Sequence, residues 1–197
     1  MAKVNVPVEQ AHRLLAGGPV VLVTASRKGR TDITPVGWCM PISSKPALVA
    51  IAIFEGSFIH ELIRSSNEFV LNVPSADLVR QVQYCGTHSG RDVDKFEETG
   101  LHPGEPRLLE VPYVDECLAH IECSLVDVLA PGDHGVFVGL VVAARAEEEA
   151  FVGGMWRLRE EKELQPIHHL GGTRYATLAL LTDDPEGQQP DERESRR

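Results

Sequence analysis

The chain has 197 residues, of which 43% are hydrophobic and 24% are charged, and its formal net charge is −10. This composition excludes a wholly disordered chain or a fibre, and the negative charge disfavours a nucleic-acid partner because we see no local basic patch. The longest apolar run, residues 48–54, is far shorter than the roughly 20 residues of a membrane span, and the start of the chain lacks the apolar core of a secretory signal. We therefore expect a cytoplasmic protein without membrane contact.

Runs of β-branched and other apolar residues, bounded by turn residues, predict most of the regular structure. Residues 118–128 partly alternate between apolar and polar side chains, as expected for a strand with one buried and one wet face. The turn at 131–135 leads into another apolar strand, so the two are expected to form a long hairpin. Strands are predicted at residues 20–25, 48–53, 69–73, 118–128, 136–144 and 175–181.

Helices are predicted to be fewer and shorter. Apolar residues share one helical face in 57–65 and again in 77–84, where Ser75 is positioned as the N-cap, and one or two turns fit 92–99. Strand pairs joined by short turns, with helices inserted between them, do not fit a repeating βαβ pattern. The order of elements favours a mainly β fold, an antiparallel barrel with short helical insertions.

The folded domain is expected to occupy residues 1–182. The remaining segment, 183–197, is polar apart from Gly187 and two prolines. Burying it would gain almost nothing to offset its ordering entropy, so we expect a disordered tail.

The chain lacks the common signatures of metal and nucleotide sites. The glycine loops of dinucleotide and triphosphate sites are absent, as are H-E-x-x-H and G-x-S-x-G. Adjacent residues on a strand point to opposite faces, so His168 and His169 form a poor chelate, and we expect no metal. No C-x-x-C pair occurs, and we expect at least two of the four cysteines to be buried thiols: Cys39, Cys85, Cys117 and Cys123.

Two segments contain groups suited to binding an anion. Ser57 follows an apolar strand and opens a predicted helix, where a hydroxyl and free backbone N–H groups form either an anion site or a plain N-cap. The segment 85–96 combines glycines and hydroxyls with Arg91 and Lys95, which suits a phosphate. The alternative for this segment is a solvated loop in which Arg91 pairs with Asp92 or Asp94.

Two further segments contain candidate binding groups. Residues 34–46 join two predicted strands, and there Trp38 and Met40 either contact a flat ring or belong to the core, with Ser43 as a possible hydrogen-bond donor. His134 lies at a hairpin tip flanked by glycines, where a surface turn is the simpler interpretation.

Taken together, these segments resemble the flavin reductase-like family, the FMN-binding split β-barrels that include flavoredoxin. The most specific piece is C-G-x-x-S-G-R-D-x-D-K-F at 85–96. The other pieces are weak singly but occur in the family's order: 21–25, V-G-W-C-M-P at 36–41, E-F-V-L-N-V-P at 68–74, G-D-H at 132–134 with F-V-G at 137–139, and H-L-G-G at 169–172 with Tyr175.

The resemblance implies a fold and a cofactor. The fold is a six-stranded antiparallel Greek-key split barrel that forms a homodimer, with FMN in a groove near the dimer interface. NADH or NADPH would donate the hydride. In this fold Ser57 meets the FMN phosphate, while Trp38, Cys39 and Met40 run beside the isoalloxazine, with Ser43 close by.

The resemblance also assigns the loop and the turn. The loop that closes over the ribityl phosphate contains Ser89, Gly90, Arg91 and Lys95, and His134 lies on the nicotinamide side. Relatives often have Asn where Asp32 stands here. Because a negative charge would disfavour the anionic reduced flavin, we expect Asp32 to point elsewhere.

Three functions remain open from the sequence. The first is an NAD(P)H-dependent flavin reductase. The second is a flavoredoxin-like carrier that passes electrons from FMN to a protein or metal acceptor, and either one is compatible with a monooxygenase or another redox protein as partner. The third is a barrel that has lost its cofactor and serves only as an interaction module.

Overall fold

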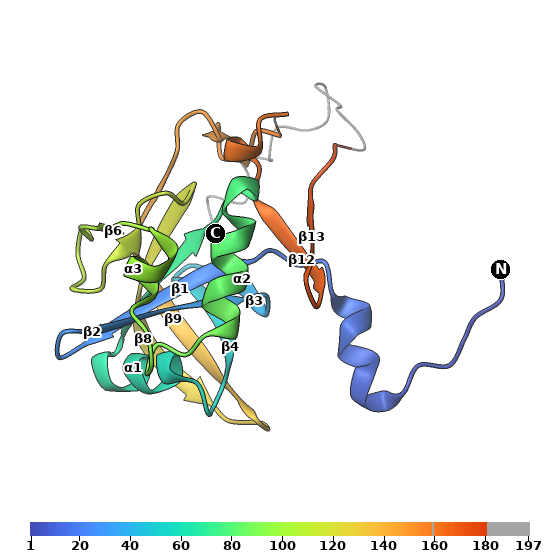
Figure 1. Cartoon of the computed structure of the whole chain (residues 1–197), viewed down its shortest axis with the longest axis horizontal. Coiled ribbons are helices and arrows are strands. Elements are labelled where there is room, and N and C mark those ends of the chain that lie inside the picture. The colour runs from blue at the N-terminus through green and yellow to red at the C-terminus, as the bar shows by residue number, and fades with distance from the viewer. Residues whose placement is uncertain (159, 181–197) are drawn as a thin grey trace.

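The computed structural model describes residues 1–158 and 160–180. The tail predicted at 183–197 lies outside the described residues. The body of the molecule is an antiparallel sheet that curls around its own core (Figure 1). Its strands follow the order β2-β1-β5-β8-β9-β4-β3, and their bounds are β1 Val21–Arg27, β2 Arg30–Val36, β3 Cys39–Ser44, β4 Ala47–Phe54, β5 Glu68–Val73, β8 Ala119–Leu129 and β9 His134–Ala146.

The sheet confirms the mainly β fold and has one strand more than the six expected. The five apolar runs between 20 and 144 all form strands, and β8 and β9 pair as the predicted long hairpin. Strands β2 and β3, by contrast, lie partly in the stretch 34–46 that the sequence suggested only as a connection. Pairing with β1 and β4 holds these two polar, proline-containing strands in extended form at the ends of the strand order, where proline is tolerated.

Helix α1 (Phe58–Ser66) packs its apolar face on the sheet and closes the main core. Its residues Ile59 and Ile63 are fully buried beside Phe69 and Phe137. The helix ends at Asn67, whose left-handed backbone conformation stops it. This packing fixes the start of α1 next to the ends of β4 and β2.

The remaining helices follow the predictions with small shifts. The segment predicted at 77–84 forms η2 (Ala76–Leu78) and α2 (Val79–Thr87). Ser75 precedes η2, but its hydroxyl donates to Asp77 instead of accepting from the helix, so it is not a side-chain cap. The third predicted helix is α3 (Lys95–Thr99), which is capped by Asp94 and ended by Gly100 at φ 68°.

Smaller elements surround the sheet. The helix η1 (Val8–Leu15) was not predicted; it projects away from the body and has no buried residue (Figure 1). The strand predicted at 175–181 overlaps β13, within the hairpin β12–β13, which reaches back to the chain just after η1. The bounds of these last elements are β6 Pro103–Gly104, β7 Tyr113–Val114, β10 Phe151–Val152, β11 Met155–Trp156, η3 Lys162–Leu164, β12 Ile167–Gly171 and β13 Arg174–Thr177.

All four cysteines are free thiols, and three are buried, which confirms the expectation of at least two: Cys85, Cys117 and Cys123. Among the residues that the structure describes, no helix has the length and apolar character needed to cross a membrane.

Candidate functional site

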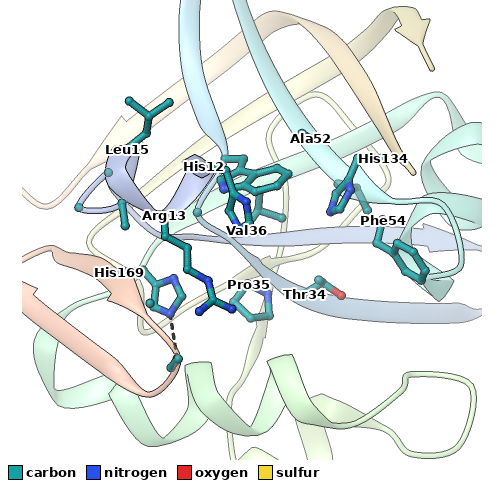
Figure 2. Close-up of a pocket in the computed structure, with 18 of the residues that line it drawn as sticks. His12, Arg13, Leu15, Thr34, Pro35, Val36, Ala52, Phe54, His134 and His169 are labelled. Atoms are coloured by element: carbon teal, nitrogen blue, oxygen red, sulfur yellow. Dashed lines mark hydrogen bonds between the residues drawn. The ribbon is translucent and has the colours of Figure 1, made fainter. Parts of the chain in front are cut away.

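A cavity of about 390 Å³ opens where η1, the end of β2, the start of α1 and the hairpin β12–β13 come together (Figure 2). Segments far apart in the sequence form its wall: 12–18, 34–38, 52–57, His134 and 169–172. Its size falls within the range of small-molecule pockets. We call it the first cavity.

The floor of the first cavity is the chain from Thr34 to Trp38. This stretch leaves β2 and crosses toward β3, so that the Trp38 ring remains half exposed. The ring lies 4.8 Å from the His134 ring and 5.7 Å from the His12 ring, measured between centroids. Together they give the cavity a flat aromatic side.

The start of α1 forms one end of the first cavity. Ser57 stands at the N-cap position, but its hydroxyl donates to the carbonyl of Phe54 at 2.7 Å and makes no side-chain cap. The N–H groups of the first helical turn have no partner inside the helix, so this end attracts an anion. Two guanidinium groups stand nearby, since Arg30 and Arg91 lie 4.3 and 5.2 Å from the centre of the Phe58 ring.

The opposite end of the first cavity is lined by glycines. Gly17 and Gly172 have φ values of +110° and +59°, in the region that residues with a side chain rarely adopt. The imidazole of His169 donates through Nε2 to the carbonyl of Gly172 at 2.9 Å and thereby holds the hairpin turn. A ligand can therefore approach the backbone closely at this end.

The charge of the first cavity is positive. Arg13 lines it and has no ion-pair partner among the described residues, and none of the lining residues is acidic. Figure 2 shows its guanidinium beside His169 and Pro35. Farther along, Nδ1 of His134 lies 2.6 Å from Asp133, and this hydrogen bond lowers the pKa of the Asp133 carboxyl.

Of the residues predicted to bind the cofactor or act in catalysis, Trp38, Ser57 and His134 lie together in the first cavity. The others do not line it. Met40 and Ser43 belong to β3 beyond Trp38, and Met40 is exposed to solvent. The thiol of Cys39 points to the carbonyl of Pro19 at 3.8 Å, and burial raises its pKa to about 11, so it stays protonated at neutral pH.

The predicted phosphate loop lies elsewhere as well. Ser89 accepts a hydrogen bond from the Arg91 backbone N–H at 3.2 Å, and Gly90 and Arg91 line a separate shallow depression beside Arg30. Arg91 pairs with Glu61 of α1, not with either aspartate of its own loop. The loop therefore contacts the start of α1 through Arg91.

The structure places Lys95 inside the protein. The residue is only 4% exposed, and Nζ lies 2.8 Å from Asp32 Oδ1. The same ammonium donates to the carbonyls of Ile33 at 2.7 Å and Cys85 at 2.9 Å. These three acceptors use its three protons, so Lys95 has no donor left for a phosphate, and Asp32 is directed into the protein.

Sequence reasoning did not assign Arg13 or His169 to the site. Both reach it because the chain at 17–20 pairs with β12, which brings the two ends of the folded domain together. The signal for His169 was present in the H-L-G-G stretch, but nothing local to Arg13 marks it. Among the described residues, no cluster of three or more His, Cys, Asp or Glu side chains is arranged to hold a metal ion.

Comparison with known proteins now adds to this geometry. A family model described as flavin reductase like domain matches residues 14–163. The YddH protein of Escherichia coli K12 is 34% identical over 178 residues, covering 87% of this chain and 94% of that protein. The reductase component of a 4-nitrophenol 4-monooxygenase/4-nitrocatechol 2-monooxygenase from Rhodococcus opacus is 28% identical over 127 residues, 64% of this chain and 65% of that one.

Solved structures share the fold. Flavoredoxin from Methanosarcina acetivorans superposes with a TM-score of 0.80 at 24% identity, covering 93% of this chain and 95% of that chain. An FMN-binding protein from Thermus thermophilus, solved with bound 1-cyclohex-2-enone, gives a TM-score of 0.77 at 25% identity, with 94% and 98% coverage.

Proposed function

The chain belongs to the flavin reductase-like family, and we propose that it binds FMN in the first cavity and transfers a hydride to it from NADH or NADPH. The observation that carries the proposal is the cavity itself, which joins an aromatic wall to an uncapped helix start and contains no acidic residue. FMN supplies the redox chemistry when bound, and the chain binds, orients and tunes it.

The dimensions and lining of the first cavity suit a flavin. Its volume of about 390 Å³ is within the usual range for a ligand that is mostly enclosed. The half-exposed Trp38 ring offers a flat apolar contact.

The phosphate belongs at the start of α1 in this proposal. Ser57 supplies an exposed hydroxyl there, which would turn from the Phe54 carbonyl to donate to a phosphate, and the N–H groups of the first turn are free of a side-chain cap. Arg91 and Arg30 add positive charge beside Phe58. Lys95 is left out of this assignment because its ammonium is occupied within the protein.

Two further groups tune the site. Arg13 gives the cavity a full positive charge, and positive charge stabilises the negative charge that a flavin gains on reduction. His134 lies against Trp38 with its ring oriented by Asp133, and we assign it to the nicotinamide side. No side chain is needed as an acid or base for the hydride step.

A second candidate function is a flavoredoxin-like carrier that passes electrons from FMN to a protein. It is favoured by the exposed apolar residues Met40 and Ile42 of β3, next to the half-exposed Trp38. Such a strip suits contact with another protein, including a monooxygenase component or the second protomer of a homodimer.

The visible absorption spectrum of the purified protein, before and after anaerobic NADH or NADPH, tests the proposal. After addition of FMN and removal of the unbound flavin, we expect the protein to retain a flavin spectrum and one of the donors to bleach it. Bleaching by dithionite but by neither nicotinamide would favour the carrier. A protein that gains no flavin spectrum on titration with FMN would overturn both and leave the interaction module.

A further inference from the structure

A second cavity, of about 500 Å³, adjoins the first. It lies between α2 and the hairpin β12–β13. Four residues line both cavities: Pro35, Gly37, His169 and Gly172. The two spaces are therefore separated only by the chain at the end of β2 and the hairpin.

The second cavity has the lining of a ligand site. Tyr84 from α2 and Tyr175 from β13 contribute aromatic rings, and Gln83 and Thr87 contribute polar groups. Among the described residues of the lining, Arg80 supplies the only full charge, and none of them is acidic. Its guanidinium is exposed and has no ion-pair partner among the described residues.

Like Arg13 in the first cavity, Arg80 has no carboxylate among the described residues that line its cavity, whereas the cations of two other cavities have acidic neighbours. Arg27 and Lys28 share their cavity with Glu68 and Glu110. Arg91 shares its depression with two aspartates and pairs with Glu61. In a chain of net charge −10, an arginine without a carboxylate beside it creates a local site of attraction for an anion.

A hydride donor such as NADH or NADPH has two halves, and the nicotinamide half belongs at the hydride-transfer site. The volume of the second cavity and its place next to that site suit the other half. We propose that the second cavity binds the adenosine 5′-phosphate half of the reduced nicotinamide dinucleotide, with Arg80 at a phosphate and the tyrosines against the adenine. The identification of the donor rests on the proposed function. The nicotinamide must reach the flavin, which the proposed function assigns to the first cavity of about 390 Å³, and we place the second half of the donor in the adjoining cavity.

The lining chemistry matches each part of this ligand. Arginine forks match phosphate oxygens in geometry, and the apolar bodies of Tyr84 and Tyr175 suit a purine ring. The shared wall is thin at Gly37, which has no side chain to separate the two spaces. The proposal therefore places one ligand across this rim, with one half on each side.

Direct binding of AMP tests the proposal without relying on turnover. Isothermal titration of AMP into the purified FMN-loaded protein is compared for wild type, Arg80→Ala and Arg64→Ala, the last replacing an exposed arginine of α1 as control. We expect Arg80→Ala to lose about tenfold in AMP affinity, as for a charge-assisted hydrogen bond. Arg64→Ala should bind as wild type does, and Arg80→Lys should recover part of the loss.

Four outcomes decide the matter. If Arg80→Ala loses AMP affinity and Arg64→Ala does not, the proposal is supported, even if neither NADH nor NADPH bleaches the flavin. Equal AMP affinity in all variants overturns it. Binding of inorganic phosphate as tightly as AMP overturns the adenosine part, because the site then recognises an anion only. Absence of AMP binding to wild type, while NADH or NADPH still bleaches the flavin, overturns it and leaves the proposed function standing.

Discussion

The segments 34–46 and 85–96 were both predicted to contain binding groups, yet they serve the site in different ways. The first leaves β2 and presents its backbone and the Trp38 ring to the first cavity. The second turns its key cation inward, where Lys95 meets Asp32 and the carbonyl of Ile33. Since Ile33 immediately precedes Thr34, the buried pair supports the cavity floor from behind.

The two segments show the difference between residues that line the cavity and residues that support its floor from behind. Gly86 lies so close to β2 that a side chain there would place its Cβ 2.9 Å from Pro35. The loop 85–95 therefore packs on the reverse of the floor through Gly86 and Lys95. A glycine-rich stretch with cations resembles a phosphate loop in sequence, but burial of the cation decides which role it has.

The largest expected effect is a loss of folding stability in the Lys95→Met variant. Removing one partner of a buried ion pair leaves Asp32 charged and unpaired, which costs about 3–5 kcal/mol of unfolding free energy. Urea unfolding followed by circular dichroism measures it, with the exposed Lys162→Met as control, where we expect a change within about 0.5 kcal/mol. A Lys95→Met protein of unchanged stability that fails to hold FMN would restore the phosphate role and reverse the comparison.

The strands were predictable wherever a continuous run of apolar residues is buried in the core. The runs at 20–25, 48–53 and 69–73 are apolar enough to be recognised singly, and each forms a strand. Strands β2 and β3 contain too many polar residues and prolines for that, and pairing with their neighbours makes them strands. Pairing information is not present in a local window of sequence.

The site was predictable only in part, for a related reason. Trp38, Ser57 and His134 stand at strand ends or turns, where exposed groups are easy to recognise, and the fold brings them together. Arg13 and His169 meet through pairing between the two ends of the domain. The ion pair of Lys95 with Asp32 was not predictable because the two residues are distant in sequence, and only the folded chain shows it.

A second buried polar group, His120, is expected to make the stability of the fold depend on pH. His120 lies in the core, where Nδ1 is 3.1 Å from Asn72 Oδ1, and burial lowers its pKa to about 4. The ordinary pKa is near 6.5, so between these values the unfolded chain binds a proton that the folded chain does not. Stability is therefore full above about pH 6.5 and falls by up to about 3 kcal/mol as the pH drops to 4.

Urea unfolding at pH 7 and pH 4.5 measures this loss. We expect His120→Gln to reduce the difference between the two pH values, because it removes the titrating group. The matched variant His134→Gln, in the first cavity, should keep the wild-type difference. An unchanged pH dependence in His120→Gln would contradict the assignment.

Glycine substitutions compare the two segments directly. A Cβ at Gly90 would collide with the buried Asp32 carboxylate, whereas the nearest atom to a Cβ at Gly37 is 3.9 Å away on His169. Gly90→Ala should therefore lose about 1–3 kcal/mol of stability by overpacking, and Gly37→Ala much less. The thermal midpoint of each variant measures this, and a larger loss for Gly37→Ala would break the comparison.

Substitution of the two serines predicted to bind the phosphate should have the smallest effect on folding. Its effect on ligand binding should be the most specific. Ser57 lines the first cavity and donates only to the carbonyl of Phe54, while Ser89 accepts from Arg91 N–H in the exposed loop. If the phosphate lies at the start of α1, Ser57→Ala weakens FMN binding by about tenfold, as expected for one hydrogen bond to a charged group. Ser89→Ala should bind FMN as wild type does. Quenching of flavin fluorescence on titration measures both, and a greater loss for Ser89→Ala would move the phosphate from the cavity to the loop.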